Sequence, residues 1–99
     1  MVDEAEEVRK EIRAGWHASE DRGYDPKFFQ DLVADLGAVG AIKKLLKTTS
    51  TPDGLYRLRE LGQLENSAEA IGLRHSTLFS PDELAEARRR LDAFGYRGT

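Results

Sequence analysis

Leu32 to Leu46 reads LVADLGAVGAIKKLL and is the most apolar stretch of this 99-residue chain. Gly37 divides it, because glycine enters the left-handed cap conformation without a Cβ clash and so favours a helix end. The apolar residues before Gly37 recur on helical spacing: Phe28, Phe29, Leu32, Val33 and Leu36. Two adjacent apolar rows follow it: Val39, Ile42, Leu46 and Ala38, Ala41, Leu45. The second half is therefore predicted to be a core helix whose opposite row, with Lys43, Lys44 and Lys47, faces water.

The rest of the chain shows the same helical spacing and clear end signals. Ser80-Pro81-Asp82-Glu83 is the best of them, a serine cap with proline at the first position and glutamate three residues on. Asn66-Ser67 is a second plausible cap. No segment alternates apolar and polar residues over four or more positions, so no strand is expected. The sequence predicts an all-α fold, a compact orthogonal or antiparallel bundle of about six short helices, at roughly 3–22, 26–37, 38–48, 55–61, 68–73 and 81–94.

Length and composition indicate one small domain over residues 1–99, with an amphipathic N-terminal helix over 1–22 and a compact body over 25–96. The chain has no cysteine, so a disulfide, a thiolate metal site and a thiol nucleophile are excluded. The acidic N-terminus has no apolar signal region, and no apolar run approaches the length of a membrane span. We therefore expect a cytoplasmic protein of bacterial or other origin, without a membrane partner.

The first helix is the leading candidate for a partner surface. It is acidic and charge-rich, carries the single tryptophan at Trp16 in one row with Ile12, and joins the body through Arg22-Gly23-Tyr24. Such a helix can dock on another protein or pair with a second copy. Trp16, Ile12 and Tyr24 are the predicted partner-binding residues of a non-catalytic domain that mediates protein–protein interaction or self-association.

A nucleic-acid-binding adaptor is the alternative, because a local basic face stands out in a chain of net charge −3. Between Lys43 and Arg59 only Asp53 is acidic, and the basic residues are Lys43, Lys44, Lys47, Arg57 and Arg59. Gln30 to Gly37 resembles the first helix and turn of a helix-turn-helix motif. The following lysine row lacks the Arg, Asn or Gln that reads base edges. Gly37 to Gly40 also matches the GxxG loop of KH domains, but its preceding flank reads as helix.

No pattern indicates catalysis, a cofactor, a metal or a small-molecule substrate. His17 and His75 are isolated from further histidines, and no serine-centred elbow is present. Thr48 to Gly54 reads as a turn-rich loop without a phosphate cradle. The run Arg88 to Arg90 is spread around its helix axis, so a solvated terminal helix is expected, with arginines pairing to nearby acids such as Glu86. The chain is predicted not to be an enzyme.

The second half also resembles a set of small uncharacterised bacterial proteins of actinobacterial type. The matching pattern is DGL..L.ELG.LE from Asp53, EAI from Glu69, and LFS..EL..AR.RL...GY from Leu78 to Tyr96. The upstream Phe28-Phe29 and Gly37 to Leu46 fit the same set. The resemblance implies a helical fold over roughly residues 24–96 and brings no activity, cofactor or site residue; it favours tryptophan where Arg59 stands.

Overall fold

The computed structural model describes residues 3–21, 23, 27–47 and 53–96, and this part is helical without a strand. Its elements are α1 (Glu4–Glu20), α2 (Lys27–Leu46), α3 (Asp53–Glu60), η1 (Leu64–Asn66), α4 (Ala68–Arg74), η2 (Ser76–Leu78) and α5 (Pro81–Ala93). The all-α class is confirmed, and the Cα radius of gyration is 12.3 Å. This part has five α elements against the expected six or so, because α2 comprises both helices predicted around Gly37, joined at that non-helical residue. No helix in the described ranges has the length and apolarity to cross a membrane.

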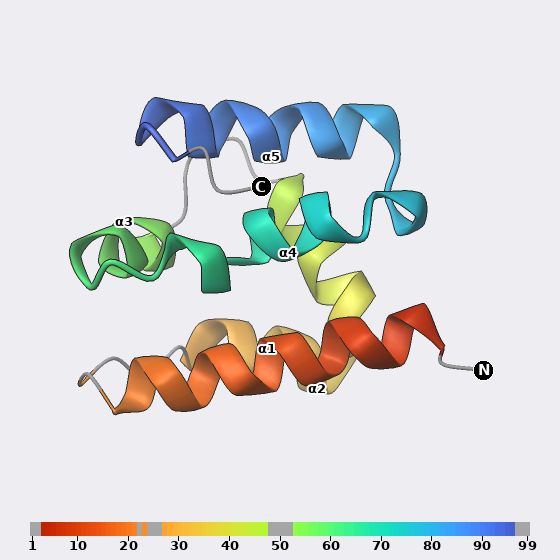
Figure 1. The fold of residues 1–99 in the computed structure, drawn as a ribbon. Coiled ribbons are helices and arrows are strands. Elements are labelled where there is room, and N and C mark those ends of the chain that lie inside the picture. The colour runs from red at the N-terminus through yellow and green to blue at the C-terminus, as the bar shows by residue number, and fades with distance from the viewer. Residues whose placement is uncertain (1–2, 22, 24–26, 48–52, 97–99) are drawn as a thin grey trace.

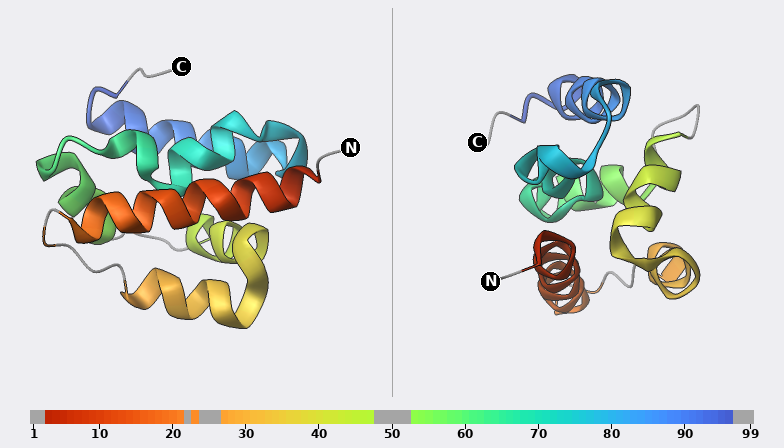
Figure 2. Two further views of the ribbon diagram at one scale, coloured as in Figure 1. Left: turned by 60° about the horizontal axis from the view of Figure 1, so that its bottom comes forward. Right: turned by 90° about the vertical axis from the view of Figure 1, so that its right-hand side faces the viewer.

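Gly37 separates two helical halves of α2, as the predicted stop requires, but it does so without the left-handed cap conformation. Its φ of 79° lies in the positive region that the sequence predicted, but its ψ of 170° is extended and not left-handed helical. That combination is essentially restricted to glycine, since a Cβ would meet the backbone. Helical geometry resumes at Ala38, so the two halves of α2 run in different directions (Figure 2). The second half supplies the buried core residues, and the first half packs on the core through the partly buried Phe29 and Val33.

The second half of α2 is the core helix that the sequence predicted. Its buried residues are Ala38, Ala41, Ile42, Leu45 and Leu46. Val39 packs on them while partly exposed. Lys44 and Lys47 are exposed as expected. Lys43 departs from the prediction, because its Nζ lies 2.9 Å from Glu83 Oε1 and 5.2 Å from the centre of the Phe79 ring.

The short helix α4 occupies the centre of the molecule. It lies between α5 on one side and α1 on the other (Figure 1), and it also contacts the second half of α2. Every residue from 68 to 72 is buried. Its start is fixed by the predicted cap, since Ser67 Oγ accepts a hydrogen bond from Ala70 N at 3.1 Å. The capping box of α5 is also confirmed: Glu83 N donates to Ser80 Oγ at 3.2 Å and Ser80 N donates to Glu83 Oε1 at 2.8 Å.

Two glycines should respond to alanine in opposite directions. Gly72 has ordinary helical geometry, and an added Cβ would lie 3.6 Å from Ile42 Cγ2 and 3.9 Å from Phe79 Cε2, which is normal contact. We expect Gly72→Ala to raise the free energy of unfolding by about 0.5–1 kcal/mol, because alanine loses less chain entropy on folding. Gly37→Ala should lower it by about 1–3 kcal/mol, since alanine cannot adopt that backbone without strain. Urea unfolding followed by circular dichroism measures the change in the free energy of unfolding for both variants. Changes of the same sign would contradict the backbone conformations described for Gly72 and Gly37.

Candidate functional site

An exposed apolar stripe runs along the first half of α2. Phe28, Leu32 and Leu36 follow each other at intervals of four residues, so they share one side of the helix. Phe28 is 70% exposed and Leu36 is 50% exposed, while Leu32 is partly buried. This half of α2 lies along the outside of the molecule beside α1 (Figure 2). Isolated exposed apolar residues are ordinary on a surface, but an aligned set of this kind favours an interaction site.

An acidic row borders the apolar stripe. Asp31 lies three residues after Phe28, and Asp35 three residues after Leu32, so each aspartate is a helix neighbour of a stripe residue. Both aspartates are exposed. Within the described residues neither has an ion-pair partner, so their charge faces solvent.

Two of the three predicted partner-binding residues, Ile12 and Trp16, pack in or on the core and are not part of the apolar stripe. Ile12 is 2% exposed and belongs to the core cluster. Trp16 is partly buried and packs edge-to-face on Phe29 of α2, with the ring centres 6.5 Å apart and the planes at 84°. The indole Nε1 is buried and has no hydrogen-bond partner among the described residues. Tyr24 lies outside the described residues. Ile12 and Trp16 thus hold α1 to the protein's own core and support the helix that carries the apolar stripe.

The five predicted basic residues differ in their surroundings. Lys43 pairs with Glu83, and Arg57 Nη1 lies 3.4 Å from Glu60 Oε2. The Arg59 guanidinium is exposed and lies 5.2 Å from the centre of the Phe94 ring. Lys44 and Lys47 are exposed on the side of α2 that the sequence indicated. Two of the five basic residues, Lys43 and Arg57, therefore have a glutamate partner that offsets their charge.

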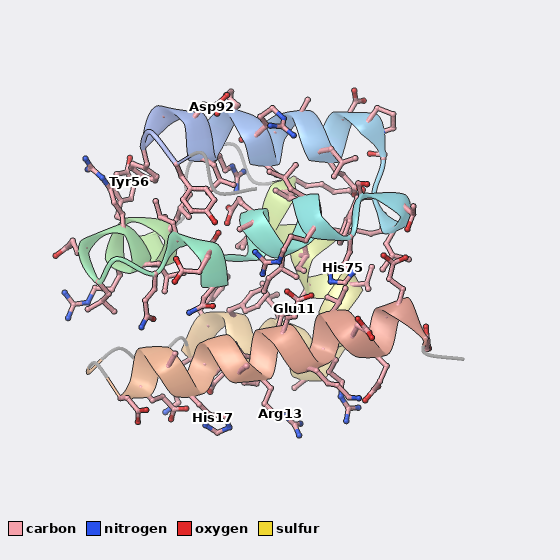
Figure 3. The ribbon with its side chains drawn as sticks, viewed as in Figure 1. Glu11, Arg13, His17, Tyr56, His75 and Asp92 are labelled. Carbon is pink, nitrogen blue, oxygen red and sulfur yellow. The ribbon has the colours of Figure 1, made fainter. Side chains whose placement is uncertain are left out.

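A polar cluster that the sequence did not indicate joins α1 to α4 and η2. His75 is 8% exposed, with its Nδ1 3.1 Å from Glu4 Oε2 and its Nε2 bonded to Glu11 Oε2. Glu11 and His75 point toward each other across the space between α1 and α4 (Figure 3). Thr77 Oγ1 donates to Glu4 Oε1 at 2.6 Å, and Arg74 Nη2 lies 2.8 Å from Glu11 Oε1. One sign was available in the sequence, because Glu4 and Glu11 are two helix turns apart and so lie on one side of α1.

These contacts shift the pKa values of Glu4, Glu11 and His75. Burial alone would lower the pKa of His75, but its hydrogen bonds to Glu11 and Glu4 outweigh burial and raise the pKa above 6.5. The hydrogen bonds from Thr77 and then His75 lower the pKa of Glu4 below 4.5. Burial opposes the same change in Glu11, but the bonds from His75 and Arg74 prevail and lower its pKa. The cluster therefore favours its charged form.

The cluster is not arranged as a metal site. Glu4 and Glu11 contact opposite nitrogens of the His75 ring, so the two carboxylates and one nitrogen cannot converge on a single ion. In the described ranges no group of three or more His, Cys, Asp or Glu side chains could hold a metal.

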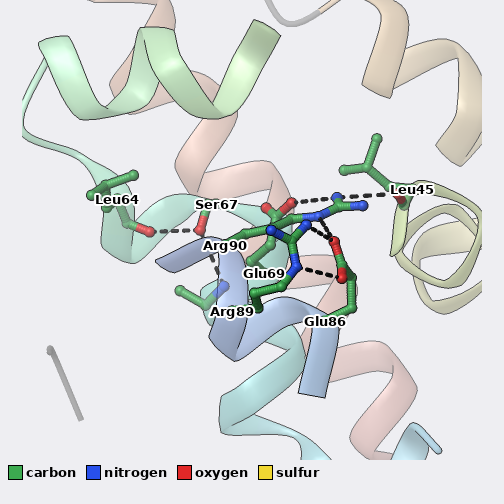
Figure 4. Close-up of polar contacts among 8 residues, drawn as sticks. Leu45, Leu64, Ser67, Glu69, Glu86, Arg89 and Arg90 are labelled. Carbon is green, nitrogen blue, oxygen red and sulfur yellow. Dashed lines mark hydrogen bonds and ion pairs between the residues drawn. The ribbon is translucent and has the colours of Figure 1, made fainter. Parts of the chain in front are cut away.

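A second cluster, in the core, overturns the expectation of a solvated arginine run. Arg90 is fully buried; its Nη1 donates to Glu69 Oε2 at 3.0 Å and to the Leu45 carbonyl at 3.2 Å, and its Nε donates to Glu86 Oε2 at 2.6 Å (Figure 4). The predicted pairing within the run is confirmed for Arg89, whose Nε lies 2.9 Å from Glu86 Oε1. Arg90 thus links α5 to α4 and to the end of α2. The sequence offered one sign, since Glu83, Glu86 and Arg90 form a row beside the apolar face of α5.

The pKa values of the two carboxylates in this core cluster are shifted in opposite directions. Burial raises the pKa of Glu69, although a backbone hydrogen bond and Arg90 act against it. The hydrogen bonds from Arg89 and Arg90 lower the pKa of Glu86 to about 2 against the effect of burial. Glu69 is 1% exposed, so its charge depends on Arg90, whereas Glu86 keeps contact with water and with Arg89. The cluster is a structural ion network and presents no open position to a substrate.

Comparison of the chain with protein-family models, with curated proteins and with solved structures finds no match. The relationship to the bacterial set of helical proteins stays a prediction.

Proposed function

We propose that this protein is a non-catalytic, cytoplasmic helical domain that binds an amphipathic helix of another protein along the apolar stripe. The observation that carries the proposal is the exposure of Phe28 and Leu36 on one side of the first half of α2. Burying a side chain of that size contributes about 1.5–3 kcal/mol, so a partner that covers both gains a useful binding energy. Helix-in-groove recognition uses such anchors at intervals of three, four and seven residues.

The acidic row sets the charge of the partner. Asp31 and Asp35 lie along one edge of the apolar stripe, so a bound helix would place its flanking residues beside two carboxylates. Lysine or arginine at those flanks is attracted to them, and aspartate or glutamate is repelled. The nine residues from Phe28 to Leu36 span about 12 Å of helix, which matches roughly two turns of a partner. The proposed occupant is therefore a basic amphipathic helix.

Three synthetic helical peptides test this proposal. They share the same leucine anchors over four turns and differ only in flanking lysine, glutamine or glutamate. The expected result is binding in the order lysine, glutamine, glutamate, measured by calorimetry and by the emission of Trp16, which packs on Phe29 of the same helix. Phe28→Ser/Leu36→Ser should weaken binding at least tenfold, about 1.4 kcal/mol.

Tyr56→Ser is the matched control, because Tyr56 is the other large apolar side chain that is exposed in the described part, at 49%, and lies on α3. It should leave peptide binding unchanged. No binding by any peptide, or an equal loss in the control, would overturn the proposal. Concentration-dependent dimerisation that Phe28→Ser/Leu36→Ser abolishes would instead assign the apolar stripe to a second copy of this chain.

A nucleic-acid-binding adaptor is the second candidate, and the exposure of Lys44 and Lys47 is what favours it. Lys43 contributes less net charge because it pairs with Glu83. If this face binds DNA or RNA, Lys44→Glu/Lys47→Glu should reduce the slope of log affinity against log salt by about 0.9 per lost phosphate contact. A low-salt shift assay measures the slope, and a wild-type protein that shifts neither nucleic acid would exclude the face.

A further inference from the structure

His75 can satisfy both of its carboxylate neighbours only when it is protonated. A neutral imidazole has one N–H donor and one acceptor lone pair, whereas an imidazolium has two donors. Nδ1 faces Glu4 and Nε2 faces Glu11, and an ionised carboxylate only accepts hydrogen bonds. Loss of the proton therefore leaves one ring nitrogen with its lone pair against a carboxylate oxygen, in a site that is 8% exposed.

We propose that the cluster of His75, Glu4 and Glu11 is a proton-dependent latch that holds α1 against α4 and η2 and releases it when His75 loses its proton. The other groups facing the cluster are Arg74, which pairs with Glu11, and Thr77, which donates to Glu4. Neither can replace the bridge between the two carboxylates, because each reaches only one of them.

Lys43 of α2 and the buried Arg90 of α5 do not take part in the latch, because each pairs with carboxylates elsewhere. Lys43 of α2 pairs with Glu83 at the start of α5. Arg90 of α5 pairs with Glu69 and Glu86. The pH response of α1 is thus attributed to His75 and its two carboxylates.

The direction of the response follows from the shifted pKa values. The pKa of His75 is raised above 6.5, so its stabilising effect is complete below pH 6.5 and is lost as the pH rises through the raised value. The pKa values of Glu4 and Glu11 are lowered, so their effect is complete above pH 4.5 and is lost as the pH falls through the lowered values. The latch is therefore closed between pH 4.5 and 6.5 and opens toward alkaline pH.

Opening would uncover the inner face of α1. Val8 is 0% exposed and Ile12 is 2% exposed, and both lie on the same continuous helix as Glu4 and Glu11. Of the residues that the sequence suggested for partner binding, Ile12 thus becomes accessible only in the open state. Proton loss from one histidine would change the apolar surface that the protein presents.

Two measurements on the full chain test the latch. The first is the NMR titration of the His75 imidazole, for which we expect a midpoint above 6.5; a midpoint at or below 6.5 would overturn the latch. The second is amide exchange, corrected for intrinsic base catalysis, at pH 6 and pH 9. The protection of the α1 amides should fall relative to that of the α5 amides. The fall should be about tenfold for each pH unit by which the pKa of His75 in the folded protein exceeds its pKa in the unfolded chain.

Variants separate the latch from general stability. His75→Gln should show low α1 protection already at pH 6, with α5 still protected and the difference between pH 6 and pH 9 abolished. His17→Gln is the matched control, because His17 is the only other histidine and lies on the outer side of α1, exposed (Figure 3); it should behave as wild type. Loss of protection in α1 and α5 together, or a pH difference that survives in His75→Gln, would overturn the latch.

Discussion

Replacing Arg90 by methionine is expected to lower the free energy of unfolding by about 3–5 kcal/mol. Methionine fills similar space but has no charge, so the Glu69 carboxyl, in a site that is 1% exposed, would have to be buried either as an unpaired ion or in its protonated form. The desolvation cost of an ion is then no longer offset by a partner at 3.0 Å. The same change also removes the hydrogen bond from Arg90 to the Leu45 carbonyl, which ties α5 to the end of α2.

The double variant Arg90→Met/Glu69→Leu distinguishes lost pairing from lost packing. With both charges removed, most of the stability should return, because apolar groups of similar volume replace buried ion pairs at little or no cost. Arg89→Met is the matched surface control: Arg89 is the adjacent arginine, also bonds Glu86, and its side chain is 58% exposed. The Arg89→Met variant should lower the free energy of unfolding by at most about 1 kcal/mol. Urea unfolding provides all three values, and a double variant as unstable as Arg90→Met would contradict the pairing argument.

Ile42→Ala is expected to have the second large effect and to lower the free energy of unfolding by about 2–5 kcal/mol. Ile42 is 0% exposed in the middle of the second half of α2, and alanine keeps the helix while leaving a cavity. Leu36→Ala is its matched control in the same helix, because Leu36 is 50% exposed and should cost less than about 1 kcal/mol. Chemical denaturation followed by circular dichroism gives both values. Equal losses would contradict the burial of the second half of α2.

Local signals in the sequence located most helix boundaries because the responsible interactions span only a few residues. The capping box at Ser80 and the cap at Ser67 form as predicted, since each joins a side chain to a backbone N–H three residues away. The break at Gly37 was also located, but its extended ψ was not, because the direction in which the chain leaves a glycine depends on what the next helix packs against.

The candidate sites were harder to predict than the helices. The sequence grouped Ile12 and Trp16 correctly on one side of α1, but spacing alone cannot say whether an apolar row faces a partner or the protein's own core. Phe28 and Leu36 belong to a row of the same kind and are the ones left exposed. The difference arises because the first half of α2 packs on the core through Phe29 and Val33, and this leaves Phe28 and Leu36 on the outside.

The sequence by itself determined the helical class, the buried face of the second half of α2 and the capped starts of α4 and α5, because periodicity and capping act within one or two helix turns. Only the tertiary structure decided that α4 lies at the centre, that Arg90 is buried against Glu69, and that His75 bridges Glu4 and Glu11. Those contacts join residues 21, 64 and 71 positions apart. Their charges are tolerable in the interior only because distant helices bring the opposite charge to the same place, and no local pattern carries that information.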